Sequence, residues 1–121
     1  MKTTIESILI ITVLIFSGLS LSAQEKKEGK IQTVKFMVQG NCDMCKERIE
    51  NAALIKGVKV VNWDKMTDSL TVIYRIDKVE LDDVHRAVAD AGHDTEKVKA
   101  SDEVYRNLPA CCAYRDESHK H

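Results

Sequence analysis

From Ile31 onward the sequence switches between the two-residue period of a β-strand and the longer period of a helix, and this alternation constrains the fold most. In the first segment Val34, Phe36 and Val38 fall on one side of a half-buried strand. Later, Cys45 and Ile49 begin an apolar series with helical spacing. Together, the two patterns predict strands at residues 31–38, 58–64, 70–75 and 95–99, and helices that end at Gly57 and Gly92.

The predicted order is strand, helix, strand, strand, helix, strand, which is the split βαβ plan. It predicts an α+β, ferredoxin-like domain with a four-stranded antiparallel sheet and both helices on one face. We place this domain at residues 31–100, after a polar leader at 24–30. Residues 101–121 form a cysteine-containing C-terminal extension whose role the pattern leaves undetermined.

The N-terminus is typical of a secretory signal peptide, which we place at residues 1–23. Lys2 precedes an apolar stretch of 14 residues from Ile8 to Leu21, whereas about 20 residues are needed to span a bilayer. We therefore expect cleavage near Ala23, export, and no stable membrane insertion afterwards. A periplasmic location follows if the source is bacterial.

Charge excludes some partners. The chain has 18 Lys and Arg residues against 19 Asp and Glu residues, a net charge of -1. With no basic excess, we expect binding to neither nucleic acid nor anionic lipid.

The strongest chemical feature is a C-x-x-C motif formed by Cys42 and Cys45. One thiol lies in the loop after the first strand and the other in the first turn of a helix, so both sulfurs can converge on one ion. The free N–H groups and dipole of that helix end stabilise thiolates. Two thiolates suit a soft ion in near-linear coordination, while zinc prefers four ligands. Cu(I) is therefore favoured, with Hg(II) and Zn(II) as alternatives.

A second cysteine pair, Cys111 and Cys112, stands near the C-terminus. These thiols could add metal ligands, form a disulfide with Cys42 or Cys45, or remain free, and four cysteines allow three pairings. Export also leaves open a structural disulfide or a thiol–disulfide redox module at the C-x-x-C.

The segment from Thr33 to Val98 resembles the heavy-metal-associated domain family, which includes copper chaperones and an exported mercury-binding protein. The resemblance rests on the C-x-x-C after the first strand, the hairpin at residues 58–75, and Ala91-Gly92-His93 before the last strand. It implies metal ligation by Cys42 and Cys45, with Cys42 as the first-exchanging thiolate.

The sequence departs from the family pattern at Gly40, where the family usually has methionine. His93 matches a family position close to the metal and is a further candidate ligand, as are Cys111 and Cys112. We expect Met44 to pack against the helix and His85 to be solvated. A terminal site of His119 and His121 is the weakest candidate.

These features predict a carrier, not an enzyme. It would bind Cu(I) and pass the ion by ligand exchange to a metal-transporting or metal-accepting protein. Lys46 and Arg48 would help to select an acidic partner. The alternatives are a resistance protein that sequesters copper or mercury with all four cysteines, and a homodimer bridged by metal through opposed loops.

Overall fold

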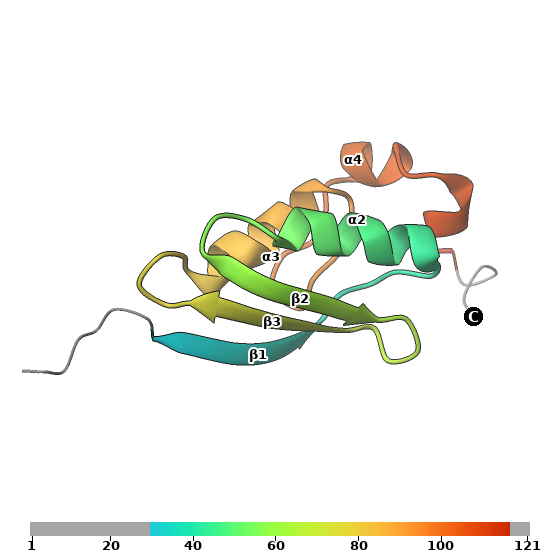
Figure 1. The fold of residues 1–121 in the computed structure, drawn as a ribbon. Coiled ribbons are helices and arrows are strands. Elements are labelled where there is room, and N and C mark those ends of the chain that lie inside the picture. The colour runs from blue at the N-terminus through green and yellow to red at the C-terminus, as the bar shows by residue number, and fades with distance from the viewer. Residues whose placement is uncertain (1–29, 117–121) are drawn as a thin grey trace, which may run out of the picture.

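The computed structural model describes residues 30–116 and has the predicted α+β, ferredoxin-like architecture (Figure 1). The expected signal peptide, residues 24–29 of the leader, His119 and His121 lie outside the described residues. Within residues 30–116, no helix has the length and apolar content needed to cross a membrane. The elements are β1 (Ile31–Met37), α2 (Asp43–Ala53), β2 (Val58–Asp64), β3 (Ser69–Arg75), α3 (Leu81–Asp90), α4 (Asp102–Arg106) and the 3₁₀ turn η3 (Ala110–Cys112).

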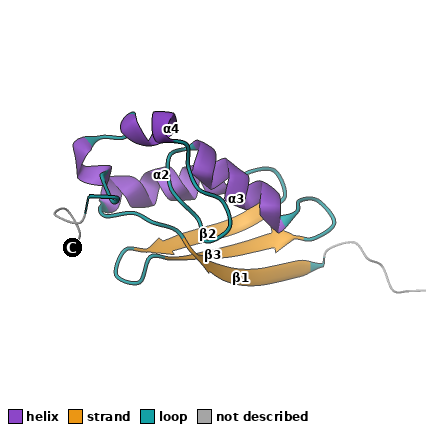
Figure 2. Ribbon diagram, turned by 180° about the vertical axis from the view of Figure 1, so that it is seen from behind, coloured by secondary structure: helices purple, strands orange, loops and turns teal. Residues whose placement is uncertain are grey.

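The three strands form one antiparallel sheet in the order β1-β3-β2. Phe36 pairs with Leu70, and Leu70 pairs with Trp63, so three large side chains cross the sheet in one row. Helices α2 and α3 both cover this face, as Figures 1 and 2 show from opposite sides. The core lies between the two layers, where Ile49 of α2 and Val88 of α3 are fully buried.

The predicted fourth strand is reduced to one bridge between Val38 and Thr95. The bridge lies just after the end of β1. In this topology the fourth strand pairs with β1. The Thr95 hydroxyl accepts a hydrogen bond from the Val98 N–H at 2.9 Å. This local turn directs the chain away from the sheet, because side-chain to backbone bonds compete with a strand ladder.

Helix α2 ends earlier than predicted, at Ala53 instead of Gly57. Gly57 lies in the following turn with a φ of 98°, a left-handed conformation that favours glycine. Its carbonyl accepts a hydrogen bond from the Arg75 N–H at 2.9 Å, which fixes the start of the β2–β3 hairpin.

The expectation that His85 is solvated is wrong, because its side chain is buried. Its ring stacks on Phe36 with the ring centroids 3.9 Å apart, and Nδ1 lies 2.7 Å from the Thr95 hydroxyl. The turn at Thr95 therefore covers a helix flank that its sequence alone marked as exposed. Burial lowers the pKa of His85, which favours the neutral ring.

Close packing against Trp63 explains the glycine at position 40. The Trp63 ring is buried and its Nε1–H donates to the Val38 carbonyl at 2.9 Å. A Cβ added to Gly40 would lie 2.8 Å from two atoms of this ring and 3.2 Å from Cys45 Cβ. The indole therefore fills space that a side chain at position 40 would need.

We predict that Gly40→Ala destabilises the fold by about 1–3 kcal/mol, the usual range for overpacking a core. Trp63→Phe will itself cost stability, but it removes the far ring atoms that the new methyl group meets. In the Trp63→Phe background, Gly40→Ala should lower the free energy of unfolding much less than it does in the wild type. Urea unfolding of the wild type, the two single variants and the double variant measures this difference. An equal cost in both backgrounds would contradict the steric explanation.

Candidate metal centre

The two cysteines of the C-x-x-C lie at the start of α2, as predicted. Cys42 is the N-cap residue, with extended backbone, and it is half-buried. Cys45 belongs to the first turn and is completely buried by the core. Their Sγ atoms are 3.4 Å apart. The helix therefore presents one reachable and one buried sulfur side by side at its N-terminus.

The surroundings separate the pKa values of these thiols. Burial raises the pKa of Cys42, but the Cys45 N–H and contacts with the other three thiols outweigh it and lower the pKa to about 7. Burial raises the pKa of Cys45, and burial together with neighbouring thiols raises that of Cys112. Near neutral pH, Cys42 is thus the favoured thiolate among these three residues.

The C-terminal extension brings two more sulfurs to the same place. Its chain runs from α4 back to the N-terminal end of α2, where η3 lies (Figures 1 and 2). Cys42 Sγ is 3.4 Å from Cys111 Sγ and 3.6 Å from Cys112 Sγ. Cys112 is buried, whereas Cys111 is exposed.

Three of the sulfurs, those of Cys42, Cys45 and Cys112, lie within 4.8 Å of one another and could hold one metal ion. All four cysteines of the chain are in the described part, and all are free thiols. Their Sγ–Sγ separations far exceed the roughly 2.05 Å of a disulfide bond. Several neutral or anionic sulfurs around one point form a donor set for a soft metal ion.

Tyr114 anchors the extension just after Cys112. Its ring is buried and stacks on His93 with the centroids 5.3 Å apart. Its hydroxyl donates to the Gly92 carbonyl at 2.6 Å and accepts from the Asp94 N–H at 2.9 Å. Both hydrogen-bonding capacities of the phenol are satisfied by the loop after α3, which fixes the position of Cys112.

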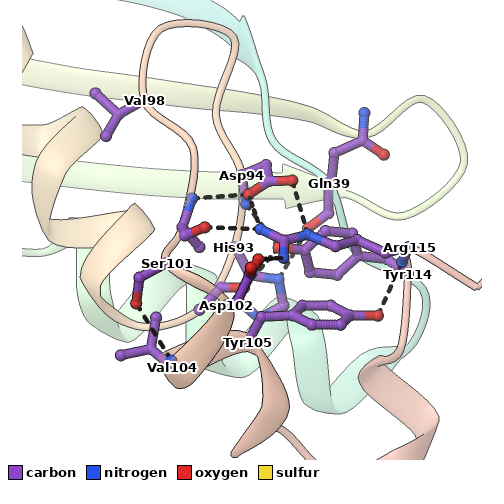
Figure 3. Close-up of polar contacts among 12 residues, drawn as sticks. Gln39, His93, Asp94, Val98, Ser101, Asp102, Val104, Tyr105, Tyr114 and Arg115 are labelled. Atoms are coloured by element: carbon purple, nitrogen blue, oxygen red, sulfur yellow. Dashed lines mark hydrogen bonds and ion pairs between the residues drawn. The ribbon is translucent and has the colours of Figure 1, made fainter.

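Arg115 adds a charged anchor beside Tyr114 (Figure 3). Its guanidinium contacts the Asp94 carboxylate at 2.8 and 3.2 Å and lies 4.3 Å from the centroid of the Tyr105 ring. The Arg115 N–H also donates to the Tyr105 hydroxyl at 3.0 Å. Although burial opposes it, the bond from Arg115 lowers the pKa of Asp94. The ion pair and stacking together hold the extension against the domain.

His93 supports the loop before Cys42. Its Nδ1–H donates to the Gln39 carbonyl at 2.8 Å, its side chain is fully buried, and burial lowers its pKa. The group of three sulfurs does not include this ring. Nε2 is buried without a hydrogen-bond partner within residues 30–116. Its role as a ligand stays a prediction, whereas its contacts show a role in positioning the loop.

Known structures share the fold of the domain. The CopZ metallochaperone is 27% identical with a TM-score of 0.51, and 53% of this chain covers 98% of that chain. Oxidized MerP from Ralstonia metallidurans CH34 is 28% identical with a TM-score of 0.52, and 55% of this chain covers 96% of that one. The apo HMA domain of the copper chaperone for superoxide dismutase, at 15% identity and a TM-score of 0.50, shares the fold over 68% of this chain and 84% of its own.

The domain of this chain is similar in fold to heavy-metal-associated domains, and it carries a C-x-x-C at the start of α2. No family model matches the sequence, and a search of curated proteins finds no match. Slightly more than half of this chain aligns with almost the whole length of CopZ and of MerP. The rest of this chain, nearly half of it, has no counterpart in either protein.

Two residues near the cysteines have contacts that the sequence did not predict. Half of the Met44 surface is exposed, and its Sδ accepts a contact from Cys111 Sγ at 3.5 Å, a neighbour that the sequence did not predict. The Lys46 ammonium donates to Glu50, Asn62 and the Trp63 carbonyl. All three of its N–H bonds are thus used within the domain, which disfavours Lys46 as a residue that selects a partner.

Sequence reasoning missed the residues that dock the extension. Tyr114 and Arg115 follow the second cysteine pair after one alanine, and Tyr105 precedes it. The two tyrosines of the extension were the available signal, since aromatic side chains favour burial with their hydroxyl groups bonded.

We predict that Cys42 is alkylated by iodoacetamide with a half-maximal rate near pH 7, because its pKa is lowered to about 7. Above that pH the thiolate dominates, and below it the rate falls. Mass spectrometry of the peptide carrying Cys42 measures the rate. In Cys111→Ala/Cys112→Ala the midpoint should move to higher pH, because the two side-chain hydrogen bonds that stabilise the Cys42 thiolate are lost. A wild-type midpoint near an ordinary cysteine value of about 8.5 would contradict this environment.

Proposed function

We propose that this protein binds Cu(I) through Cys42 and Cys45 and passes it to a metal-accepting protein by ligand exchange. The observation that carries the proposal is the pair of sulfurs 3.4 Å apart at a helix N-terminus, one half-buried and one fully buried. The likeness to the CopZ metallochaperone and to MerP supports a soft ion as cargo.

The donor atoms favour a soft ion. Thiolates prefer Cu(I) and Hg(II), while zinc in closed protein sites takes four ligands in a tetrahedron. The paired sulfurs at the helix start suit an ion of low coordination number. Hg(II) and Zn(II) remain the alternatives that a competition experiment compares.

Unequal burial gives the two cysteines separate parts in transfer. Cys42 is reachable from solvent, so an incoming thiolate of the partner meets the ion on that side. Cys45 is held by the packing of α2 and releases the ion last. The ion passes through a state shared by both proteins, its charge and oxidation state unchanged, and no substrate is chemically transformed.

The proposal places this transfer outside the cytoplasm, in the periplasm of a bacterial source, on the strength of the N-terminal apolar stretch. The partner is a metal transporter or acceptor that presents cysteines. Two copies joined by one ion through opposed loops are a second arrangement, which the oligomeric state of the loaded protein tests.

Sequestration is the second candidate function, and the position of the extension favours it. Cys112 Sγ lies 3.6 Å from Cys42 Sγ and is buried, so an ion between them would have less access to a partner. A copper or mercury resistance protein would use this arrangement to hold the ion, whereas a carrier would have to release the extension first.

We predict that the reduced protein binds Cu(I) tightly in anaerobic competition against chelators, and that Cys42→Ser weakens binding by about two orders of magnitude, or ~2.7 kcal/mol. Parallel titrations with Hg(II) and Zn(II) rank the metals. Cys111→Ser/Cys112→Ser separates the two functions: unchanged affinity supports the carrier, and a large loss with faster release supports sequestration.

If the protein binds none of the three metals tightly, both the carrier and the sequestration function are contradicted. That result would leave the thiol–disulfide redox module, which turnover with a dithiol reductant and a scrambled disulfide substrate tests directly. Met66→Leu, an exposed substitution in the β2–β3 turn, is the control for general effects on the fold.

A further inference from the structure

The site contains more sulfur than one soft ion needs. Five sulfur atoms from the loop, the first turn of α2 and η3 form a continuous chain of contacts, which we call the sulfur cluster. It consists of Cys42, Met44, Cys45, Cys111 and Cys112. A Cu(I) ion is satisfied by two or three thiolates, so one ion would leave donors unused.

The sulfur cluster divides into two overlapping sets. The inner set is Cys42, Cys45 and Cys112, whose sulfurs lie within 4.8 Å of one another. The outer set is Cys42, Cys111 and Cys112, with separations of 3.4, 3.6 and 4.0 Å. Met44 Sδ extends the outer set, 3.5 Å from Cys111 Sγ. Cys42 and Cys112 belong to both sets.

These separations suit metal coordination. With metal–sulfur bonds of about 2.3 Å, two sulfurs on a three-coordinate ion lie roughly 4 Å apart. The outer separations of 3.4 to 4.0 Å are close to this value. Only small side-chain movements would therefore place an ion among the sulfurs of each set.

We propose that one chain binds two Cu(I) ions, one in each set, with the thiolates of Cys42 and Cys112 shared between them. This inference rests on the proposed Cu(I) binding and extends it in capacity. Loading displaces the protons of the thiols, up to four for the four cysteines, and the two positive charges offset half of the resulting negative charge. Copper remains Cu(I) throughout.

The two positions differ in access. Cys45 and Cys112 are fully buried, so the inner ion is shielded from solvent and from chelators. The outer ion has exposed ligands, since Cys111 is exposed and Met44 is half exposed. The inner ion keeps one reachable ligand, Cys42, so its shielding is relative to the outer ion. The outer ion should therefore bind second, bind more weakly and exchange first.

The test is anaerobic native mass spectrometry of the reduced full-length protein during titration with Cu(I), together with competition against a weak and a strong chelator. We expect a monomer with two Cu(I) ions. Cys111→Ser should stop at one ion and keep the affinity of the first. Met44→Leu should weaken only the second ion several-fold, and the control Met66→Leu should change neither.

Three results would overturn the inference: wild type that saturates at one ion per chain, a second ion found only in species of two chains, or Cys111→Ser that still takes two ions. Tight binding of a single ion would contradict the two-ion site alone. Absence of tight Cu(I) binding would contradict the proposed function as well, so the two failures are distinguishable.

Discussion

The burial of one face of α2 is the constraint on which the site depends. Cys45 and Ile49 are fully buried beneath the helix, which fixes its first turn against the sheet. Because Cys42 caps the same helix, its sulfur is positioned by this packing. The dense fit of Trp63 against Gly40 then holds the incoming loop. The core thus determines where the sulfurs lie, and the helix N-terminus favours the thiolate at Cys42.

The extension depends on a second, polar constraint. Tyr114 joins Gly92 and Asp94, and Arg115 pairs with Asp94, so the loop after α3 serves as its dock. This loop also carries His93, which bonds to Gln39 in the cysteine loop. The two ends of the sulfur cluster are therefore attached to the same short loop. A movement of that loop would affect both cysteine pairs together.

The sequence predicted those parts of the structure that local patterns determine. Alternating residues in β1 and the hairpin marked the strands, and a C-x-x-C between a strand and a helix predicted the approach of Cys42 to Cys45. The fourth strand is limited to the bridge at Thr95, where the hydroxyl accepts a bond from the Val98 N–H, and no sequence pattern predicted this turn. His85 was expected to be exposed because its position on the helix flank is polar in pattern. It is buried because the segment after the helix folds back and places Thr95 against its ring.

The position of Cys111 and Cys112 could not be predicted because it depends on contacts between residues distant in sequence, such as Tyr114 with Gly92. Because those contacts bring the second cysteine pair to the first, the central claim is that the metal centre contains only sulfur ligands. X-ray absorption at the copper edge, on the protein loaded with one Cu(I), tests it most directly. The account predicts two or three sulfur ligands and no nitrogen or oxygen; a histidine nitrogen in the first coordination shell would contradict it.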